Sequence, residues 1–234
     1  MTVSALVSGG KDSIYAAYLA DTQGWPVDEL VTMAPADPDS WLFHTPNLAL
    51  VPLQAEAWGK SHRSVPVPGT DESAELAALE GALAGVRGPI VTGAIESSYQ
   101  WARLLRVADR VGRRLFAPLW RKPPERVVRE EISAGLDIRF VHLAAESLGA
   151  ELLGERLDLA RLEDLAGRRA THPAVHVAGE GGEYETAVVD APFFRARLVW
   201  DEVDRVVGPS TARLVVRRAH LMRKAPFGPR RSAT

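Results

Sequence analysis

The stretch "ALVSGGKDSIYAAYLA" (residues 5–20) places a compact polar loop between an apolar run and a helical pattern. The apolar run, residues 3–7, has the composition of a buried strand and ends just before the pair Gly9-Gly10. After the loop, apolar residues recur at helical spacing until Gly24 interrupts them. The stretch therefore predicts a strand, a loop and a helix in direct succession.

The composition fits one large globular domain or two small ones. The chain has 234 residues, of which 46% are hydrophobic, and a net charge of -2 at pH 7. This balance gives no general attraction to nucleic acids or anionic membranes, so such a partner would need a local basic patch. The absence of cysteine excludes disulfides, thiolate zinc sites, cysteine nucleophiles and persulfide relays within the chain.

The N-terminal residues do not have the pattern of a secretory signal. They lack a basic segment followed by a long apolar core, and no run approaches the roughly 18 apolar residues of a membrane span. We therefore expect a cytoplasmic protein without a membrane association.

Beyond the first helix, short apolar strands alternate with helical patterns. We predict strands at residues 30–33, 65–67 and 90–94, and a helix at 48–58 in which Pro52 falls in the first turn. Thr70 is a candidate cap for a helix whose inner face is Leu76, Leu79, Leu83 and Val86. A further helix has the predicted inner stripe Leu104, Leu105, Ala108 and Val111. This alternation predicts an α/β fold with a mostly parallel sheet, helices on both faces, and ligands at the carboxyl ends of the strands.

Paired prolines near residue 123 indicate a domain boundary. We place the first domain at residues 1–120 and a smaller α+β domain at 121–222. The segments "RARLVWDEV" and "ARLVVRRAHLM" alternate apolar and polar residues, which predicts an antiparallel or mixed second sheet. Residues 223–234, rich in arginine and proline, are predicted to be disordered.

Three interpretations compete for the loop "SGGKDS" (residues 8–13). It could be an ordinary strand-to-helix turn whose glycines only satisfy backbone dihedrals. A Walker-type loop is excluded, because that motif needs four residues between its first glycine and its Gly-Lys pair. The third interpretation is a pyrophosphate cradle, with hydroxyl donors from Ser8 and Ser13 and the N–H groups of the following helix. In that cradle Lys11 would neutralise phosphate charge and Asp12 would help to hold Mg²⁺.

The loop resembles the signature Ser-Gly-Gly-x-Asp-Ser of the PP-loop ATP pyrophosphatases. Four further stretches resemble motifs of the diphthine–ammonia ligase family, in the family's order. They are "SWLFHTPN" (residues 40–47), "GAIESSYQWAR" (93–103), "APLW" (117–120) and "GEGGEYETAVVDAPFF" (179–194). The resemblance implies a HUP-like nucleotide-binding domain and a C-terminal domain that helps to recognise the substrate.

The resemblance also implies a reaction. Members amidate diphthine on translation elongation factor 2 with ATP, Mg²⁺ and ammonium, through an acyl-adenylate, and release AMP and pyrophosphate. Two alternatives stay open: a PP-loop pyrophosphatase acting on another carboxylate or a tRNA base, and a non-catalytic ATP-binding sensor. For a tRNA partner, Arg103, Arg106, Arg110, Arg113 and Arg114 would form the basic face. The sequence leaves a homo-oligomer open.

The motif matches imply the following site residues. The nucleotide would contact Ser8, Gly9, Gly10, Lys11, Asp12, Ser13, His44, Gly93, Tyr99, Gln100 and Arg103, with Asp12 as the metal ligand. The acceptor would contact Glu180, Gly181, Gly182, Glu183, Tyr184 and Glu185. Lys11, Asp12 and Glu183 would be catalytic. Carboxylates and a tyrosine face suit diphthine, which carries a quaternary ammonium group.

Several of these residues also have an ordinary structural interpretation. Asn47 could be a helix cap, Gly93 a tight packing turn and Arg103 a solvated helix residue. His172 and His176 are four residues apart, but Pro173 between them argues against a helical metal pair. We expect these two histidines to be structural.

Overall fold

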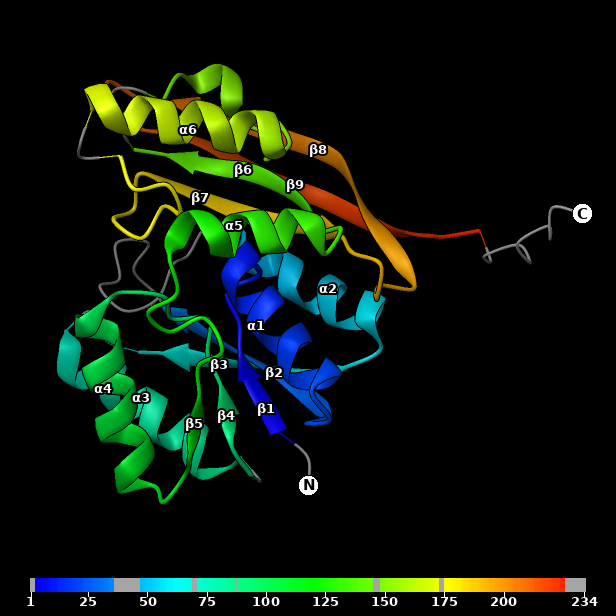
Figure 1. Ribbon diagram of the computed structural model, residues 1–234. Coiled ribbons are helices and arrows are strands. Elements are labelled where there is room, and N and C mark those ends of the chain that lie inside the picture. The colour runs from blue at the N-terminus through cyan, green and yellow to red at the C-terminus, as the bar shows by residue number, and fades with distance from the viewer. Residues whose placement is uncertain are drawn as a thin grey trace, which may run out of the picture.

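A computed structural model describes residues 3–35, 47–68, 71–86, 88–144, 148–172 and 175–225. In this part of the chain two sheets lie one above the other, with helices between and around them (Figure 1). The first sheet is built by the N-terminal half and the second by the C-terminal half.

The first sheet has five strands in the order β3-β2-β1-β4-β5, and all neighbouring pairs are parallel. The strands are β1 (Val3–Leu6), β2 (Val27–Pro35), β3 (Ser61–Val67), β4 (Ile90–Val91) and β5 (Leu115–Phe116). The chain runs outward from β1 to β3 and then returns to the other side of β1 with β4. This reversal makes the carboxyl ends of β1 and β4 the switch point of the sheet, where ligands bind in such folds.

Helices cover both faces of this sheet, as predicted from the alternating pattern. They are α1 (Lys11–Thr22), α2 (Val51–Trp58), α3 (Glu72–Ala84) and α4 (Ser98–Arg110), with a 3₁₀ turn (Leu48–Leu50) before α2. Helices α3 and α4 pack on one face, and α1 and α2 lie between the two sheets (Figure 1). No helix within the described ranges combines the length and apolar character needed to cross a membrane.

The second sheet has the order β7-β6-β9-β8 and is antiparallel throughout. Its strands are β6 (Asp137–Leu143), β7 (Tyr184–Asp190), β8 (Ala196–Val207) and β9 (Ala212–Arg223). It is accompanied by α5 (Pro124–Ser133), a 3₁₀ turn (Ala150–Leu152) and α6 (Leu159–Thr171). These pairings confirm the prediction of an antiparallel or mixed second sheet.

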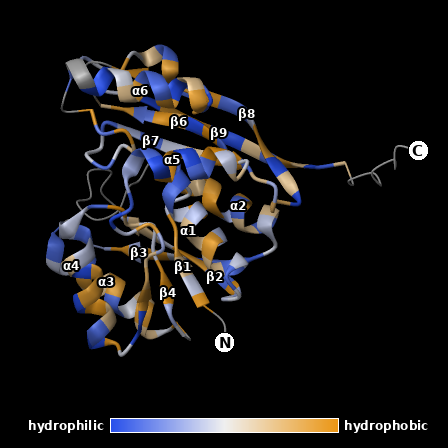
Figure 2. Ribbon diagram, viewed as in Figure 1, coloured by the Kyte–Doolittle hydropathy of each residue, from blue (hydrophilic) through white to orange (hydrophobic). Residues whose placement is uncertain are grey.

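The two sheets share one hydrophobic core. A single cluster of buried residues contains Val3 and Ile14 from the N-terminal half together with Phe140 and Val188 from the C-terminal half. A second, smaller cluster lies under α3 and α4. In Figure 2 the strands β1 and β2, which are mostly buried, are largely hydrophobic, whereas α5, most of whose residues are not buried, is largely hydrophilic. The C-terminal half therefore folds against α1 and α2 rather than beside them.

Two details of the helices differ from the sequence prediction. Leu105 was expected on the inner stripe of α4 but is 43% exposed, and Val107 takes the buried position instead. Helix α3 is capped by Asp71, whose side chain accepts a hydrogen bond from the Ala74 N–H at 2.9 Å. The predicted cap, Thr70, lies outside the described residues.

The two ends of the second half also bear on the sequence prediction. Strand β9 includes Arg223, and the Lys224 ammonium lies 2.5 Å from a carboxylate oxygen of Asp190. The first residues of the predicted tail therefore lie in the described part and residues 226–234 lie outside it, so the disorder of the tail stays a prediction. The boundary between residues 120 and 121 falls between the last strand of the first sheet and α5, and it stays a prediction.

The shared core indicates which shortened side chain should destabilise the protein. Phe140→Ala removes a fully buried ring that packs edge-on against Tyr184, with ring centroids 5.2 Å apart. We expect the free energy of unfolding to fall by about 3–5 kcal/mol, measured by urea denaturation. The control Leu105→Ala should change it by less than about 0.5 kcal/mol, because that side chain is exposed. Equal effects would contradict the placement of both residues.

Candidate active site

The loop between β1 and α1 depends on two adjacent glycines. Gly9 has a φ of +83°, and a Cβ added there would lie 2.7 Å from Oε1 of Gln54. Gly10 occupies the N-cap position of α1 and provides no side-chain cap. Apart from the Lys11 N–H, which Thr186 accepts, the first N–H groups of the helix are therefore left for another acceptor. The hydroxyl oxygens of Ser8 and Ser13 lie 3.4 Å apart beside them. These are the parts of an anion cradle at a helix N-terminus.

The C-terminal half holds this loop in place. The Gly9 carbonyl accepts hydrogen bonds from the Val188 N–H at 3.0 Å and from Nε2 of Gln54 at 2.9 Å. The same Gln54 nitrogen donates to the Val188 carbonyl at 2.8 Å, and the Lys11 N–H donates to Oγ1 of Thr186 at 3.2 Å. The loop of residues 8–13, which we call the phosphate-type loop, is therefore fixed by hydrogen bonds from α2 and β7.

Gly93 follows β4 on the other side of the switch point. A Cβ at this position would lie 2.7 Å from the Ser13 nitrogen. Any side chain here would push the start of α1 away from the end of β4. The packing interpretation of Gly93 thus applies, and it also sets the width of the switch point.

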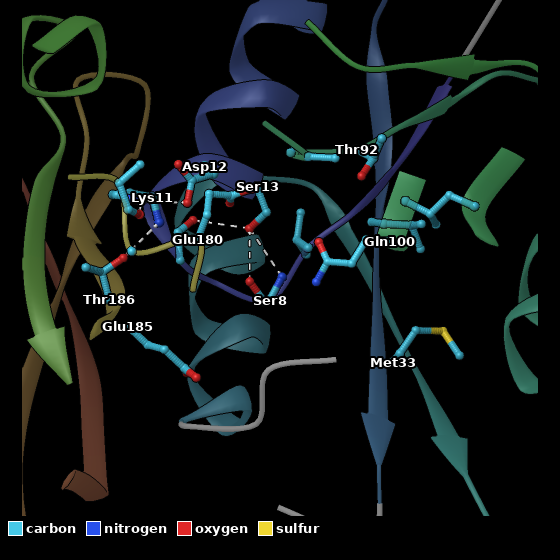
Figure 3. A pocket seen from close by; sticks show the side chains of 18 of the residues that line it. Ser8, Lys11, Asp12, Ser13, Met33, Thr92, Gln100, Glu180, Glu185 and Thr186 are labelled. Carbon is cyan, nitrogen blue, oxygen red and sulfur yellow. Dashed lines mark hydrogen bonds and ion pairs between the residues drawn. The ribbon is translucent and has the colours of Figure 1, made fainter. Parts of the chain in front are cut away.

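A cavity of about 180 Å³ opens at the switch point. It is lined by both halves of the chain, with Ser8 and the residues at the start of α1 gathered beside Glu180 (Figure 3). The lining residues are Leu6, Val7, Ser8, Gly10, Lys11, Asp12, Ser13, Val31, Met33, Leu79, Thr92, Gly93, Ala94, Gln100, Arg103, Leu104, Ala178, Gly179, Glu180, Tyr184, Glu185 and Thr186. The lining combines charged and hydroxyl side chains with apolar ones such as Val31, Met33 and Leu79.

The Lys11 ammonium is engaged inside the protein. Its Nζ donates to Oδ2 of Asp12 at 2.7 Å and to the Ala178 carbonyl at 2.6 Å, and it lies 5.5 Å from the centre of the Tyr184 ring. Burial alone would lower the pKa of Lys11, but the neighbouring charges, Asp12 above all, raise it. The residue is only 2% exposed, and two of the three ammonium donors are directed to Asp12 and Ala178, so its predicted contact with phosphate stays a prediction.

A buried carboxyl group backs Asp12. Glu131 of α5 is completely buried, and neither of its carboxyl oxygens has a hydrogen-bond partner in the described part of the chain. Burial, followed by the charge of Asp12, raises the pKa of Glu131 well above its ordinary value, although Lys11 acts in the opposite direction. Burial next to the ion pair of Lys11 and Asp12 therefore favours the protonated form of Glu131.

The glycine-rich loop places its carboxylates differently. Oε2 of Glu180 accepts a hydrogen bond from the Glu96 N–H at 3.1 Å, and the residue lines the cavity. Burial and then the charge of Asp12 raise the pKa of Glu180. Glu183 turns back on its own loop, where its two oxygens accept from the N–H groups of His176 and Gly181 at 3.2 and 3.0 Å. Glu180 therefore faces the cavity, and Glu183 is used to shape the loop.

Glu185 and Tyr184, which were also predicted to contact the acceptor substrate, differ in what their side chains bind. Glu185 lines the cavity, and its Oε1 lies 3.7 Å from Nδ1 of His142. The Tyr184 hydroxyl donates to the Val177 carbonyl at 2.6 Å, so this ring is buried beside Lys11. A cation from outside would therefore meet the carboxylates before the tyrosine face.

Helix α4 presents Gln100 and Arg103 to the cavity. Arg103 stacks on Tyr99 with 3.2 Å between its guanidinium carbon and the ring centre, and it pairs with Glu72 of α3 at 2.7 Å. The stacking confirms that Tyr99 and Arg103 share a helix face. Further along α4, Arg110 pairs with Glu80 at 3.4 Å. The basic face suggested for a tRNA is thus partly neutralised by the acids of α3.

The structure brings most of the predicted site residues together. The predicted residues outside the cavity lining are Gly9, Tyr99, Gly181, Gly182 and Glu183, and His44 lies outside the described residues. Asn47 takes the cap position of the 3₁₀ turn, but its amide instead donates to the Leu214 carbonyl at 2.7 Å. Sequence reasoning missed Gln54, Glu131 and Thr186, of which only Thr186 lies in a stretch with a recognisable motif.

The fold and cavity define an α/β protein with a phosphate-type loop at the switch point of a parallel sheet. Two family profiles match the chain: "Diphthamide synthase N-terminal domain" over residues 1–115 and "Diphthamide synthase C-terminal domain" over residues 123–222. The chain belongs to the diphthamide synthase family.

Individual relatives agree with this assignment. The chain is 32% identical to a protein named diphthine–ammonia ligase from Bos taurus, over 91% of this chain and 87% of the relative. It is 31% identical to the protein of the same name from Homo sapiens, with the same coverage. A solved structure, described as a predicted subunit of tRNA methyltransferase from Methanocaldococcus jannaschii, is 15% identical with a TM-score of 0.46. It covers 82% of this chain and 98% of its own. That likeness is too weak to add to the assignment.

The buried carboxyl of Glu131 should make the stability of the protein depend on pH. Its raised pKa means that the folded protein keeps a proton that the unfolded chain loses above about pH 4.3, so this group lowers stability as pH rises. Glu131→Gln removes the effect. We expect the free energy of unfolding of the variant, relative to wild type, to increase between about pH 5 and pH 7, measured by denaturation in the presence of a chelator.

Glu130 on the same helix is the matched control. Burial alone would raise its pKa, but hydrogen bonds from Arg126 and Lys122 outweigh it and lower the pKa. Glu130→Gln should therefore lose stability relative to wild type as pH rises through the acidic range. A Glu131→Gln difference that is flat with pH would contradict the raised pKa of Glu131.

Proposed function

We propose that the protein is an ATP-dependent ligase that amidates diphthine on translation elongation factor 2, using ammonium and releasing AMP and pyrophosphate. The observation that carries the proposal is one cavity in which the phosphate-type loop of a diphthamide synthase family member faces carboxylates from its C-terminal half. An anion and a cationic acceptor can therefore meet in one place. We also propose that the reaction takes place in the cytoplasm.

The polar lining residues suit the phosphates of ATP. The uncapped start of α1 offers N–H donors and the positive end of the helix dipole, and Ser8 and Ser13 add hydroxyls. The apolar lining residues, which include Val31, Met33 and Leu104, suit the flat nucleobase. Lys11 takes a positioning role here, because its ammonium holds Asp12 and the Ala178 carbonyl.

The residues at the start of α1 fit Mg²⁺. Oδ1 of Asp12 is buried without a hydrogen-bond partner, whereas Oδ2 is taken by Lys11. Within the described residues no three acidic or histidine side chains are grouped to hold a metal alone. Asp12 would therefore hold the ion together with ATP phosphates, which is the usual arrangement for Mg²⁺. When bound, the ion would neutralise charge on the leaving pyrophosphate.

The chemistry needs two displacements. In the first, an acceptor carboxylate oxygen forms a bond to the α-phosphorus, and the bond from that phosphorus to pyrophosphate breaks. In the second, ammonia attacks the acyl carbon, the bond to AMP breaks, and the nitrogen loses a proton. The protein contributes positioning and charge placement, and no side chain becomes covalently bound.

The loop geometry favours Glu180 over Glu183 as the carboxylate that meets the cationic substrates. Glu180→Gln should lower turnover at least about tenfold, since it removes a charge from the cavity wall. Glu183→Gln, the comparison variant, keeps one of the two oxygens that accept backbone N–H groups of the loop, so it should lower kcat less than Glu180→Gln does. Steady-state kinetics with varied acceptor distinguish the two. The opposite order of effects would return the catalytic role to Glu183.

The function is tested by AMP and pyrophosphate release from ATP and Mg²⁺. Ammonium is varied, and a diphthine-bearing elongation factor 2 is present or absent. We expect release that requires both, with a mass shift of the factor that corresponds to amidation. Release that ignores the factor would indicate another carboxylate or a tRNA base as acceptor, and ATP binding without release would indicate a sensor.

A further inference from the structure

His176 makes an unusual number of contacts for a half-buried loop residue. Its Nδ1 accepts hydrogen bonds from the N–H groups of Ala178 and Glu180, both at 3.3 Å. Because Nδ1 is an acceptor in both bonds, the proton of the neutral ring is on Nε2. Nε2 can then donate to Oε2 of Glu96, which lies at 3.1 Å. One imidazole therefore connects the backbone at Ala178 and Glu180 to Glu96, in the segment after β4.

Glu96 completes a reciprocal arrangement. Its backbone N–H donates to Oε2 of Glu180, and its carboxylate receives Nε2 of His176. The segment after β4 and the glycine-rich loop are thus connected twice, once through each side chain. The Glu96 carboxylate is 48% exposed, so its part of the link is expected to contribute little on its own.

Both backbone polar groups of Ala178, its N–H and its carbonyl, form hydrogen bonds. Its N–H is bound by His176, and its carbonyl accepts from the buried ammonium of Lys11 at 2.6 Å. Two residues later the backbone N–H of Glu180 is bound by the same imidazole nitrogen. Between them Gly179 has a φ of +74°, so the backbone turns sharply here. The direction of the Glu180 side chain follows from these fixed peptides.

We propose that His176 is a positioning residue, whose Nδ1 acceptor fixes the backbone at Ala178 and Glu180 and so directs the Glu180 carboxylate into the cavity. This inference rests on the proposed function only for its kinetic consequence. The backbone role is a property of the folded chain and can be measured without turnover.

Two substitutions separate the roles of the two ring nitrogens. In His176→Asn the amide Oδ1 takes the place of Nδ1 and keeps the acceptor, but contact with Glu96 is lost. In His176→Gln the terminal amide can still reach Glu96, but no acceptor remains at the Nδ1 position. His220→Asn is the matched control, because that imidazole is exposed on β9 and pairs with Asp201 at 2.9 Å.

The first readout is amide hydrogen exchange in the intact protein. We expect the Ala178 and Glu180 amides to exchange about two- to tenfold faster in His176→Gln than in wild type, and at nearly wild-type rates in His176→Asn and His220→Asn. Unchanged exchange in His176→Gln, or equal acceleration in both His176 variants, would overturn the proposal. If His176→Gln does not fold, His176→Ser removes the acceptor in a smaller side chain.

The second readout is kinetic. His176→Gln should lose about 10- to 100-fold in kcat, with an unchanged melting temperature and nucleotide KM, since a misplaced catalytic group costs that order of rate. His176→Asn should restore kcat to within about threefold of wild type. Faster exchange with wild-type kcat would overturn the positioning of Glu180. Absence of ligase activity in wild type would instead count against the proposed function, with the exchange result still deciding the backbone role.

Discussion

A buried ammonium group is the constraint on which the site depends. Lys11 is 2% exposed, and a cation in that position must have its hydrogen bonds and its counter-charge supplied by the protein. They come from Asp12 next to it and from the Ala178 carbonyl, which is far away in sequence. The phosphate-type loop and the glycine-rich loop therefore depend on each other for their conformation. Neither half of the chain can present its part of the cavity alone.

The same dependence appears in the backbone. The Gly9 carbonyl is bound from β7 and from Gln54, and the Lys11 N–H is bound by Thr186. A loop that must approach phosphates has few side chains of its own to hold it, since its glycines provide none. Strand β7 and the buried amide of Gln54 supply that support. Strand β7 can give this support because its residues Val188 and Val189 belong to the hydrophobic cluster that the two sheets share.

The sequence predicted the order of elements and the position of the loop, because apolar strands and amphipathic helices leave strong periodic signals. It did not predict features that depend on contacts between distant segments. Leu105 was expected inside because it fits helical spacing, but the buried positions of α4 are Val107 and Ala108. Lys11 looks like a phosphate ligand in a motif, and only the folded chain shows its ammonium facing Ala178. Glu131 is one glutamate among several on a charged helix, and its burial cannot be read from its neighbours in sequence.

The positive and negative ends of the cavity are formed by different secondary-structure elements. The charges of Lys11 and Asp12 cancel each other, and burial raises the pKa of Glu131 behind them, so the start of α1 keeps the positive character of its helix dipole. The carboxylates that remain on the wall, Glu180 and Glu185, belong to the glycine-rich loop and the start of β7. An anion is favoured at one end and a cation at the other. If Glu131 were ionised, the added negative charge would sit beside the phosphate end, so the burial of this carboxyl keeps the two ends distinct.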